Sequence, residues 1–124
     1  MDLPTLDKAN QIVENRLIKD VNGQCDIYTG PQKNKYGLVK LTFMGNKLSL
    51  YAHRVAKMHS MGVTAFEPFL KCSHLCHNTL CCNPAHIVLE VQGINNNRQN
   101  CRTRRICAGH ASPEGDALLA CIFF

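Results

Sequence analysis

Apolar residues recur along this chain with two different periods. One is typical of amphipathic helices and the other of strands, so the pattern predicts where each kind of element lies. In residues 5–19 the apolar positions fall near one helical face, which predicts an amphipathic helix capped by Thr5 or Asp7. A second helix is expected over residues 52–61, ending at Gly62, and a polar, basic helix over residues 95–105. Stretches rich in β-branched and aromatic residues predict strands at 25–29, 36–43, 48–51 and 87–91.

These elements predict an α+β fold with an antiparallel β-hairpin sheet. Residues 36–43 and 48–51 are the strands of the hairpin, and residues 44–47 form its turn. No repeat, linker or low-complexity segment divides the chain, and its 124 residues suit a single domain over 1–124 that includes the apolar-ended tail 108–124. No apolar run approaches the roughly 18 to 20 residues of a membrane span, so no membrane partner is expected.

Composition adds positive charge and an excess of cysteine and histidine to this picture. Fourteen Lys and Arg residues against nine Asp and Glu residues give a formal net charge of +5, which suits a polyanionic partner. The chain also has eight cysteines and six histidines. Its first residues are polar and mixed in charge, unlike a secretory signal, so we expect an intracellular protein with reduced thiols rather than disulfides.

A block of cysteines and histidines between residues 72 and 86 has the spacing of metal ligands. Four residues separate Cys76 from Cys81 and Cys81 from His86, and thiolates and imidazole at such intervals suit tetrahedral Zn²⁺. A fourth ligand must come from elsewhere, either Cys25 on the first strand or nearby Cys72. A closed site with four ligands is structural, so the sequence predicts a small zinc-stapled domain.

His74 and Asn95 are not needed to fill that zinc site. A histidine on one strand, a second strand and an asparagine on the next helix form a ββα unit that can place both side chains on one side of a cleft. Neutral imidazole can accept a proton from water near pH 7. An amide oxygen suits Mg²⁺, which can bridge a scissile phosphate and its leaving oxygen. The alternative for His74 is a supporting role beside the zinc ligands.

The same residues carry a resemblance to a known family. The match runs without gaps from 72 to 101 and includes Ser73-His74-Leu75-Cys76-His77-Asn78, Cys81, Asn83-Pro84, His86, Glu90, Asn95, Arg98 and Cys101. This core resembles the His-Cys box homing endonucleases of the His-Me finger, or ββα-metal, nuclease superfamily. The resemblance implies that His74 is the general base and that Asn95 is the protein ligand of a catalytic Mg²⁺. It implies a structural zinc held by Cys25, Cys76, Cys81 and His86.

The resemblance also implies contacts with DNA and a second zinc. The lysine-bearing hairpin would lie in the major groove, and a basic side chain near the end of the sheet, Lys47 or Arg54, would stabilise the phosphate. Family members close a second zinc with Cys, Cys, His and a nearby last Cys, which this chain lacks. The residues available here are Cys101, Cys107, His110 and, far downstream, Cys121. Related enzymes use their C-terminal tail to brace a homodimer. Because the tail of this chain is short, a homodimer and a monomer both stay open.

Other residues have simpler interpretations. The basic run 102–105 is a candidate nuclear signal, although phosphate contact or solvation of the helix is the simpler explanation. Arg98 shares a helix face with Asn95 and is a candidate phosphate contact, whereas Glu90 is most simply a carboxylate at the end of a strand. Surface or supporting roles are expected for the histidines His53, His59 and His77, and Cys72 and Cys82 are expected to be spare thiols.

Together these observations predict a site-specific endonuclease that hydrolyses phosphodiesters in double-stranded DNA by a one-metal mechanism, in the nucleus. The rival class is a DNA-binding module that keeps the zinc fold without catalysis, for which the altered tail argues. A third class is a zinc-stabilised protein-interaction domain, in which the net charge is incidental. The presence of both His74 and Asn95 favours the enzyme.

Overall fold

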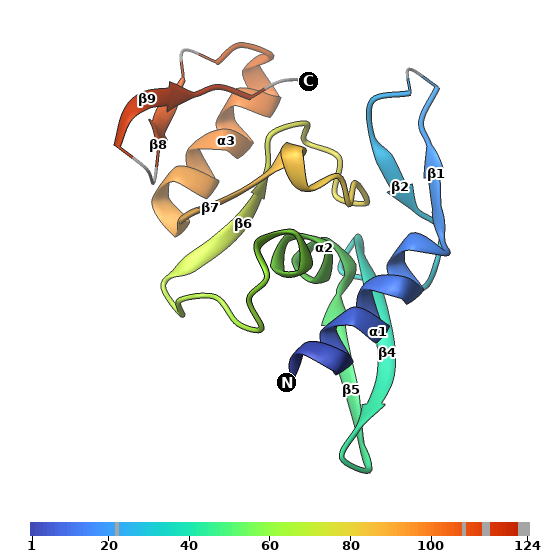
Figure 1. Cartoon of the computed structure of the whole chain (residues 1–124). Helices are drawn as coiled ribbons and strands as arrows, with labels where there is room; N and C mark the ends of the chain where they lie inside the picture. Colours follow the sequence, from blue (N-terminus) through green and yellow to red (C-terminus); the bar gives the residue numbers. More distant parts are fainter. Residues whose placement is uncertain (22, 108, 113–114, 122–124) are drawn as a thin grey trace.

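Three α-helices and several short antiparallel sheets alternate along the chain in the computed structural model (Figure 1), which describes residues 1–21, 23–107, 109–112 and 115–121. In chain order the elements are α1 (Leu3–Glu14), β1 (Leu17–Lys19), β2 (Asp26–Tyr28), β3 (Gln32–Lys33), β4 (Tyr36–Phe43), β5 (Asn46–Tyr51), α2 (Ala52–Met61), β6 (Leu70–His74), the 3₁₀ turn η1 (Pro84–His86), β7 (Ile87–Val91), α3 (Gln92–Arg104), β8 (His110–Ser112) and β9 (Gly115–Leu119). The predicted α+β class with an antiparallel hairpin is confirmed.

Helix α1 begins and ends earlier than the apolar pattern indicated. The Asp2 carboxylate accepts a hydrogen bond from the backbone N–H of Thr5 at 2.8 Å, so Asp2 is the N-cap, rather than Thr5 or Asp7. The helix ends at Glu14, and residues 17–19 instead form β1, which pairs with β2. The prediction of a helix as far as residue 19 was therefore wrong.

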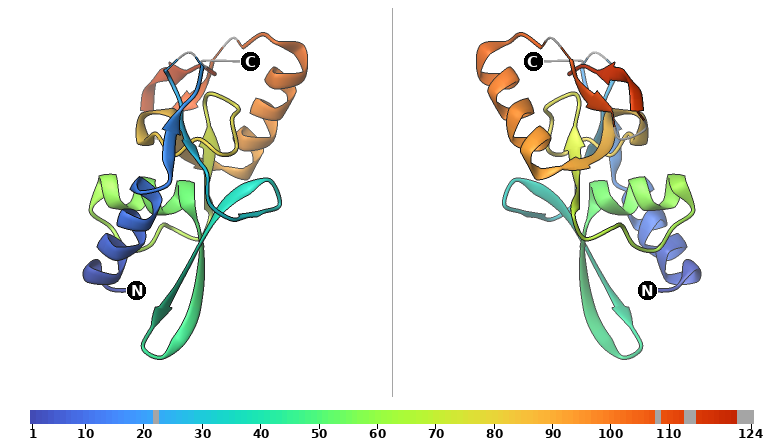
Figure 2. Two further views of the ribbon diagram at one scale, coloured as in Figure 1. Left: turned by 90° about the vertical axis from the view of Figure 1, so that its right-hand side faces the viewer. Right: turned by 90° about the vertical axis from the view of Figure 1, so that its left-hand side faces the viewer.

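The predicted hairpin is the longest pair of a three-stranded sheet with the order β3-β4-β5. Its register runs from Leu38 opposite Tyr51 to Phe43 opposite Asn46, which leaves a loop of two residues. Both loop residues, Met44 and Gly45, have positive φ, the conformation that matches the twist of a two-residue hairpin. The hairpin projects away from the rest of the molecule in all views (Figures 1 and 2).

Helices α1 and α2 pack against each other and against the β4–β5 pair, and they enclose the main apolar core. Helix α2 has its predicted bounds and ends at Gly62, which adopts a φ of 69°. Gly37 on β4 lies against the ring of buried Tyr28, and a Cβ there would collide with that ring. The buried core residues are Leu6, Ala9, Val13, Tyr28, Val39, Ala52, Val55, Ala56, Met58 and Cys82.

A ββα unit follows, as the sequence predicted. Strand β6 pairs antiparallel with β7 over its whole length, from Leu70 opposite Val91 to His74 opposite Ile87. Helix α3 begins directly after β7 and contacts both strands. Figure 1 shows this unit between the N-terminal helices and the β8–β9 hairpin, so that the strand bearing His74 lies near the middle of the molecule.

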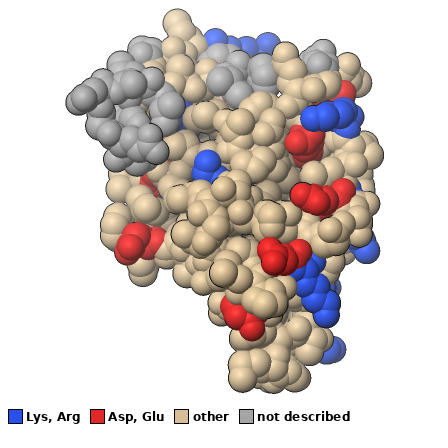
Figure 3. Space-filling model, viewed as in Figure 1, with Lys and Arg blue, Asp and Glu red and all other residues tan. Residues whose placement is uncertain are grey.

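The tail contributes the β8–β9 hairpin, although residues 108, 113–114 and 122–124 of the predicted tail lie outside the described residues. Within the described part of the chain, no helix combines the length and apolar character needed to cross a membrane. The face drawn in Figure 3 has acidic side chains across its middle, and basic ones lie mainly toward its edges. Positive charge therefore does not dominate this face of the molecule.

Candidate functional site

Four metal-ligating side chains meet where β2 contacts the loop between β6 and η1. The cluster comprises Cys25, Cys76, Cys81 and His86, whose ligand atoms all lie within 4.8 Å of one another. An isolated bridge between Ile27 and Cys81 brings the first strand pair to this loop. Of the two candidates for the fourth ligand, Cys25 therefore joins the cluster, whereas Cys72 lies on β6 and lines a different cavity.

The donor set of this first cluster fits a zinc ion. The Sγ atoms of Cys25 and Cys81 lie 3.7 and 3.5 Å from Nδ1 of His86. Burial raises the pKa of Cys25 to about 11, whereas a hydrogen bond from the Cys76 thiol lowers the pKa of Cys81 to about 5. The crowded thiols cannot all ionise easily by themselves, and a bound divalent cation would stabilise their thiolates. Three buried thiols and an imidazole match a structural zinc site.

A second cluster joins the end of α3 to the tail. The ligand atoms of Cys101, Cys107, His110 and Cys121 also lie within 4.8 Å of one another. The Cys101 and Cys121 Sγ atoms lie 3.3 and 3.9 Å from Nε2 of His110, and the Cys121 N–H lies 3.3 Å from Sγ of Cys107. The β8–β9 hairpin turns the chain back between His110 and Cys121, which is how a distant cysteine reaches this cluster. These residues could hold a second structural zinc.

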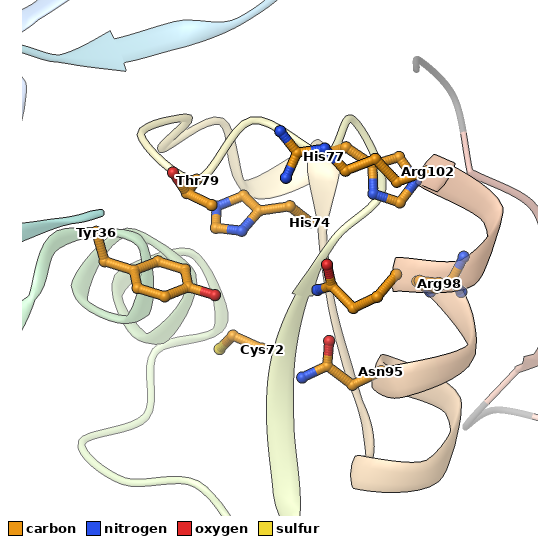
Figure 4. A pocket seen from close by; sticks show the side chains of 9 residues that line it. Tyr36, Cys72, His74, His77, Thr79, Asn95, Arg98 and Arg102 are labelled. Atoms are coloured by element: carbon orange, nitrogen blue, oxygen red, sulfur yellow. The ribbon is translucent and has the colours of Figure 1, made fainter. Parts of the chain in front are cut away.

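A separate cavity brings His74 and Asn95 together between β6, α3 and the loop after β6 (Figure 4). His74 comes from the end of β6 and Asn95 from the first turn of α3. Among the described residues, none of those that line the cavity is an Asp or a Glu. The lining residues are Tyr36, Cys72, His74, His77, Thr79, Asn95, Arg98, Gln99 and Arg102.

The imidazole of His74 is held in one orientation. Its Nε2 lies 3.0 Å from the backbone carbonyl oxygen of Cys81. Because a carbonyl only accepts, Nε2 donates its hydrogen, and the lone pair of the neutral ring is then on Nδ1. Burial lowers the pKa of His74, which keeps the ring neutral. Nδ1 is therefore a proton acceptor in this cavity.

Aromatic rings pack around His74, and His53 is one of them. The centroid of the His53 ring lies 4.8 Å from that of His74 and 5.1 Å from that of Tyr36. Only 5% of His53 is exposed, so of the two roles expected for this residue, surface or supporting, burial excludes the surface one. Burial lowers the pKa of His53 to about 3, and the neighbouring His74 and the positive charge of Arg54 act in the same direction. His59 is on the surface, as expected, with its Nε2 3.1 Å from a carboxylate oxygen of Asp7.

Arg98 does not reach toward solvent, contrary to the expected phosphate contact. Its Nε and Nη2 donate to the two carboxylate oxygens of Glu90 at 2.7 and 2.5 Å, and both side chains are almost fully buried. Nη1 lies 3.5 Å from Sγ of Cys121. The ion pair ties α3 to β7, so Arg98 positions the helix that carries Asn95. The sequence feature that could have indicated this ion pair is Glu90, an acidic residue within the otherwise apolar strand 87–91.

The two basic residues expected to bind phosphate lie away from the cavity. Lys47 is exposed near the tip of the hairpin, opposite Thr42. The guanidinium of Arg54 lies 5.3 Å from the ring centroid of Phe66. Neither residue lines the cavity. A role of Lys47 or Arg54 in binding the phosphate stays a prediction. Arg102, from the basic run 102–105, does line it.

Comparison with known families identifies the chain. Residues 22–117 match the model of the zinc-binding loop region of homing endonuclease. The chain belongs to this family. The match spans both Cys/His clusters except Cys121, and it confirms the resemblance to His-Cys box homing endonucleases. A search of curated proteins found no match.

Proposed function

We propose that this homing-endonuclease family member hydrolyses phosphodiester bonds in double-stranded DNA, with His74 as the general base. The observation that carries the proposal is the fixed His74 ring, with Nε2 bound to the Cys81 carbonyl and with Asn95 lining the same cavity. Nδ1 would take a proton from a water molecule, and the water oxygen would attack phosphorus. The bond from phosphorus to the 3′ oxygen then breaks, and that oxygen takes a proton from solvent.

Asn95 fits the role of a magnesium ligand. It offers one amide oxygen to a cavity that has no carboxylate among its described lining residues, and Mg²⁺ commonly has few protein ligands and keeps several waters. When bound, Mg²⁺ would supply positive charge to the phosphate and to the leaving oxygen. The amide of Asn95 would orient the substrate relative to His74.

Further properties belong to the same proposal. A single cavity of this kind would cut one strand of the DNA. Cleavage of both DNA strands at one specific site therefore favours two polypeptide chains acting together. A DNA substrate and the basic run 102–105 support an intracellular, nuclear location. Zinc at the two clusters would have a structural role, because each cluster offers four protein ligands and leaves no open position.

The test is cleavage of a randomised duplex pool by purified protein in Mg²⁺, with His74→Ala and His59→Ala compared side by side. We expect the wild type and His59→Ala to cut, and we expect His74→Ala to lose at least about 100-fold in rate, the typical contribution of a general base. Zinc content and the circular dichroism spectrum of His74→Ala should be unchanged. Loss of zinc from this variant would make His74 structural and refute its role as a base.

The same randomised DNA pool distinguishes the endonuclease from the two alternatives, a DNA-binding module and a protein-interaction domain. If the wild type cuts nothing but retains DNA with a steep salt dependence, the protein is a binding module and the proposed chemistry is wrong. If it neither cuts nor retains DNA, the protein-interaction class is favoured. Asn95→Ala should abolish cleavage at low Mg²⁺ without loss of zinc.

A further inference from the structure

One basic side chain at the cavity, Arg102, has no role in the reaction described so far. We propose that Arg102 is the cation that binds the scissile phosphate, an inference that rests on the proposed endonuclease function. Arg102 would reach the phosphate from α3, opposite the sheet on which the phosphate contact was expected.

The position of Arg102 follows from helical periodicity. Asn95, Arg98 and Arg102 are spaced by three and four residues on α3, which places them on one face of the helix. All three line the cavity, and in Figure 4 the side chain of Arg102 extends from α3 toward the side of the cavity where His74 lies.

The other basic residues near the site are occupied or distant. Arg98 has its guanidinium engaged by Glu90 and Cys121 and is only 1% exposed. Lys47 and Arg54 do not line the cavity. Arg102 is exposed, and no carboxylate pairs with it among the described residues. It is therefore the basic side chain at the cavity whose charge is available to a substrate.

The chemistry of a guanidinium suits this role. Its planar set of N–H donors can bind two oxygens of one phosphate, and it stays protonated throughout the usable pH range. As water adds to phosphorus, negative charge grows on the phosphate oxygens. A cation already in place stabilises that charge more than it stabilises the bound substrate. Losing one such donor typically lowers the rate by about 100-fold to 1000-fold.

The experiment compares Arg102→Gln with Arg104→Gln on a duplex that the wild type is found to cut in the randomised pool. Arg104 is the matched control, because it is an exposed arginine on the same helix that does not line the cavity. Under single-turnover conditions we expect Arg102→Gln to be about 100-fold slower and Arg104→Gln to stay within about threefold of wild type. Arg102→Lys should recover part of the rate, since it restores the charge but not the planar fork.

A second measurement tests contact with the phosphate itself. Replacing the scissile phosphate with a neutral methylphosphonate should abolish the difference in DNA affinity between wild type and Arg102→Gln. Equal cleavage rates for the Arg102→Gln and Arg104→Gln variants, whether both fall or neither does, would overturn the inference and leave the endonuclease proposal standing. A wild type that cuts no DNA would overturn both.

Discussion

Replacing Glu90 with glutamine should strongly destabilise the protein, because it leaves the buried guanidinium of Arg98 without its negative partner. The two side chains are 0% and 1% exposed, and they share two hydrogen bonds of 2.5 and 2.7 Å. Glutamine keeps the shape of glutamate and one acceptor oxygen, so the main change is loss of charge. The perturbation thus isolates the electrostatic part of the link between β7 and α3.

The magnitude follows from that burial. Removing one partner of a buried ion pair typically costs about 3–5 kcal/mol, because the remaining charge stays out of water without compensation. Domains of this size commonly have about 5–15 kcal/mol of total stability, so the variant should lose a large fraction of it. Replacing both partners with apolar residues, as in Glu90→Leu with Arg98→Met, should be far less damaging, since no buried charge remains.

The assay is urea unfolding of the zinc-loaded protein, followed by circular dichroism. With a slope of about 1.5 kcal/mol per M, a loss of 3 kcal/mol lowers the midpoint by about 2 M. The matched control is Asp26→Asn, which removes the carboxylate of an ion pair with Lys19 of similar length, 2.5 Å, in which 63% of the lysine side chain is exposed. This variant should move the midpoint much less, because water already screens the pair.

A loss below about 1 kcal/mol in Glu90→Gln would refute the reasoning, since it would mean that Arg98 finds water or another acceptor. An equal loss in Asp26→Asn would also contradict it, because burial would then not decide the cost. Zinc content measured alongside separates an effect of the ion pair from an effect on the neighbouring Cys121 cluster.

Three further predictions concern the metal, the pH and the backbone. Cys81→Ser should bind one zinc fewer per chain by atomic absorption and lose its cooperative unfolding transition, whereas Cys72→Ser should keep both ions. The pKa of His53, lowered to about 3 by burial, lies below the 6.5 of an unfolded histidine, so the unfolded chain takes up the extra proton as the pH falls. Between pH 7.5 and 5.5, His53 should therefore lower the free energy of unfolding of the wild type by about 1.4 kcal/mol. In urea unfolding over the same pH range, the stability of His53→Gln should fall by about 1.4 kcal/mol less than that of the wild type. Gly37→Ala should cost about 1–3 kcal/mol, because the added methyl meets a buried tyrosine ring, whereas Gly93→Ala on α3 has open space and should gain about 0.5–1 kcal/mol in thermal unfolding.

Each of these predictions has an outcome that would contradict it. Retention of all zinc by Cys81→Ser would remove Cys81 from the ligand set. Equal acid sensitivity of wild type and His53→Gln would show that water reaches the His53 ring. A neutral effect of Gly37→Ala would mean that the tyrosine ring moves aside without loss of packing.

Elements with strong local signals could be predicted with accurate bounds. Strand 36–43 and strand 87–91 alternate or are rich in β-branched residues, and helix 52–61 ends at a glycine with positive φ. The first helix was predicted too long because Leu17 also fits the apolar face of a helix. Its place in a strand depends on pairing with Tyr28, a contact that no local pattern contains.

The residues of the candidate site also divide into those that local spacing identifies and those that depend on contacts between distant parts of the chain. Spacing within residues 72–86 was enough to identify Cys76, Cys81 and His86 as a metal set, because these ligands are close in sequence. Choosing Cys25 over Cys72 from spacing alone was not possible, since that depends on a bridge between strands far apart in the chain. The role of Arg98 was misjudged for the same reason. Its partner Glu90 lies eight residues away on another element, and helical spacing alone suggested a free guanidinium.

The small size of the chain explains why the cavity depends on so many links. His74 belongs to β6, whose end is held by the first cluster through Cys76 and by the hydrogen bond to the Cys81 carbonyl. Asn95 belongs to α3, which the Glu90–Arg98 pair ties to β7. Because β6 pairs with β7, these contacts together set how far the imidazole lies from the amide. The main apolar core includes neither residue, so the first Cys/His cluster and a buried ion pair perform the positioning that a larger domain would leave to packing.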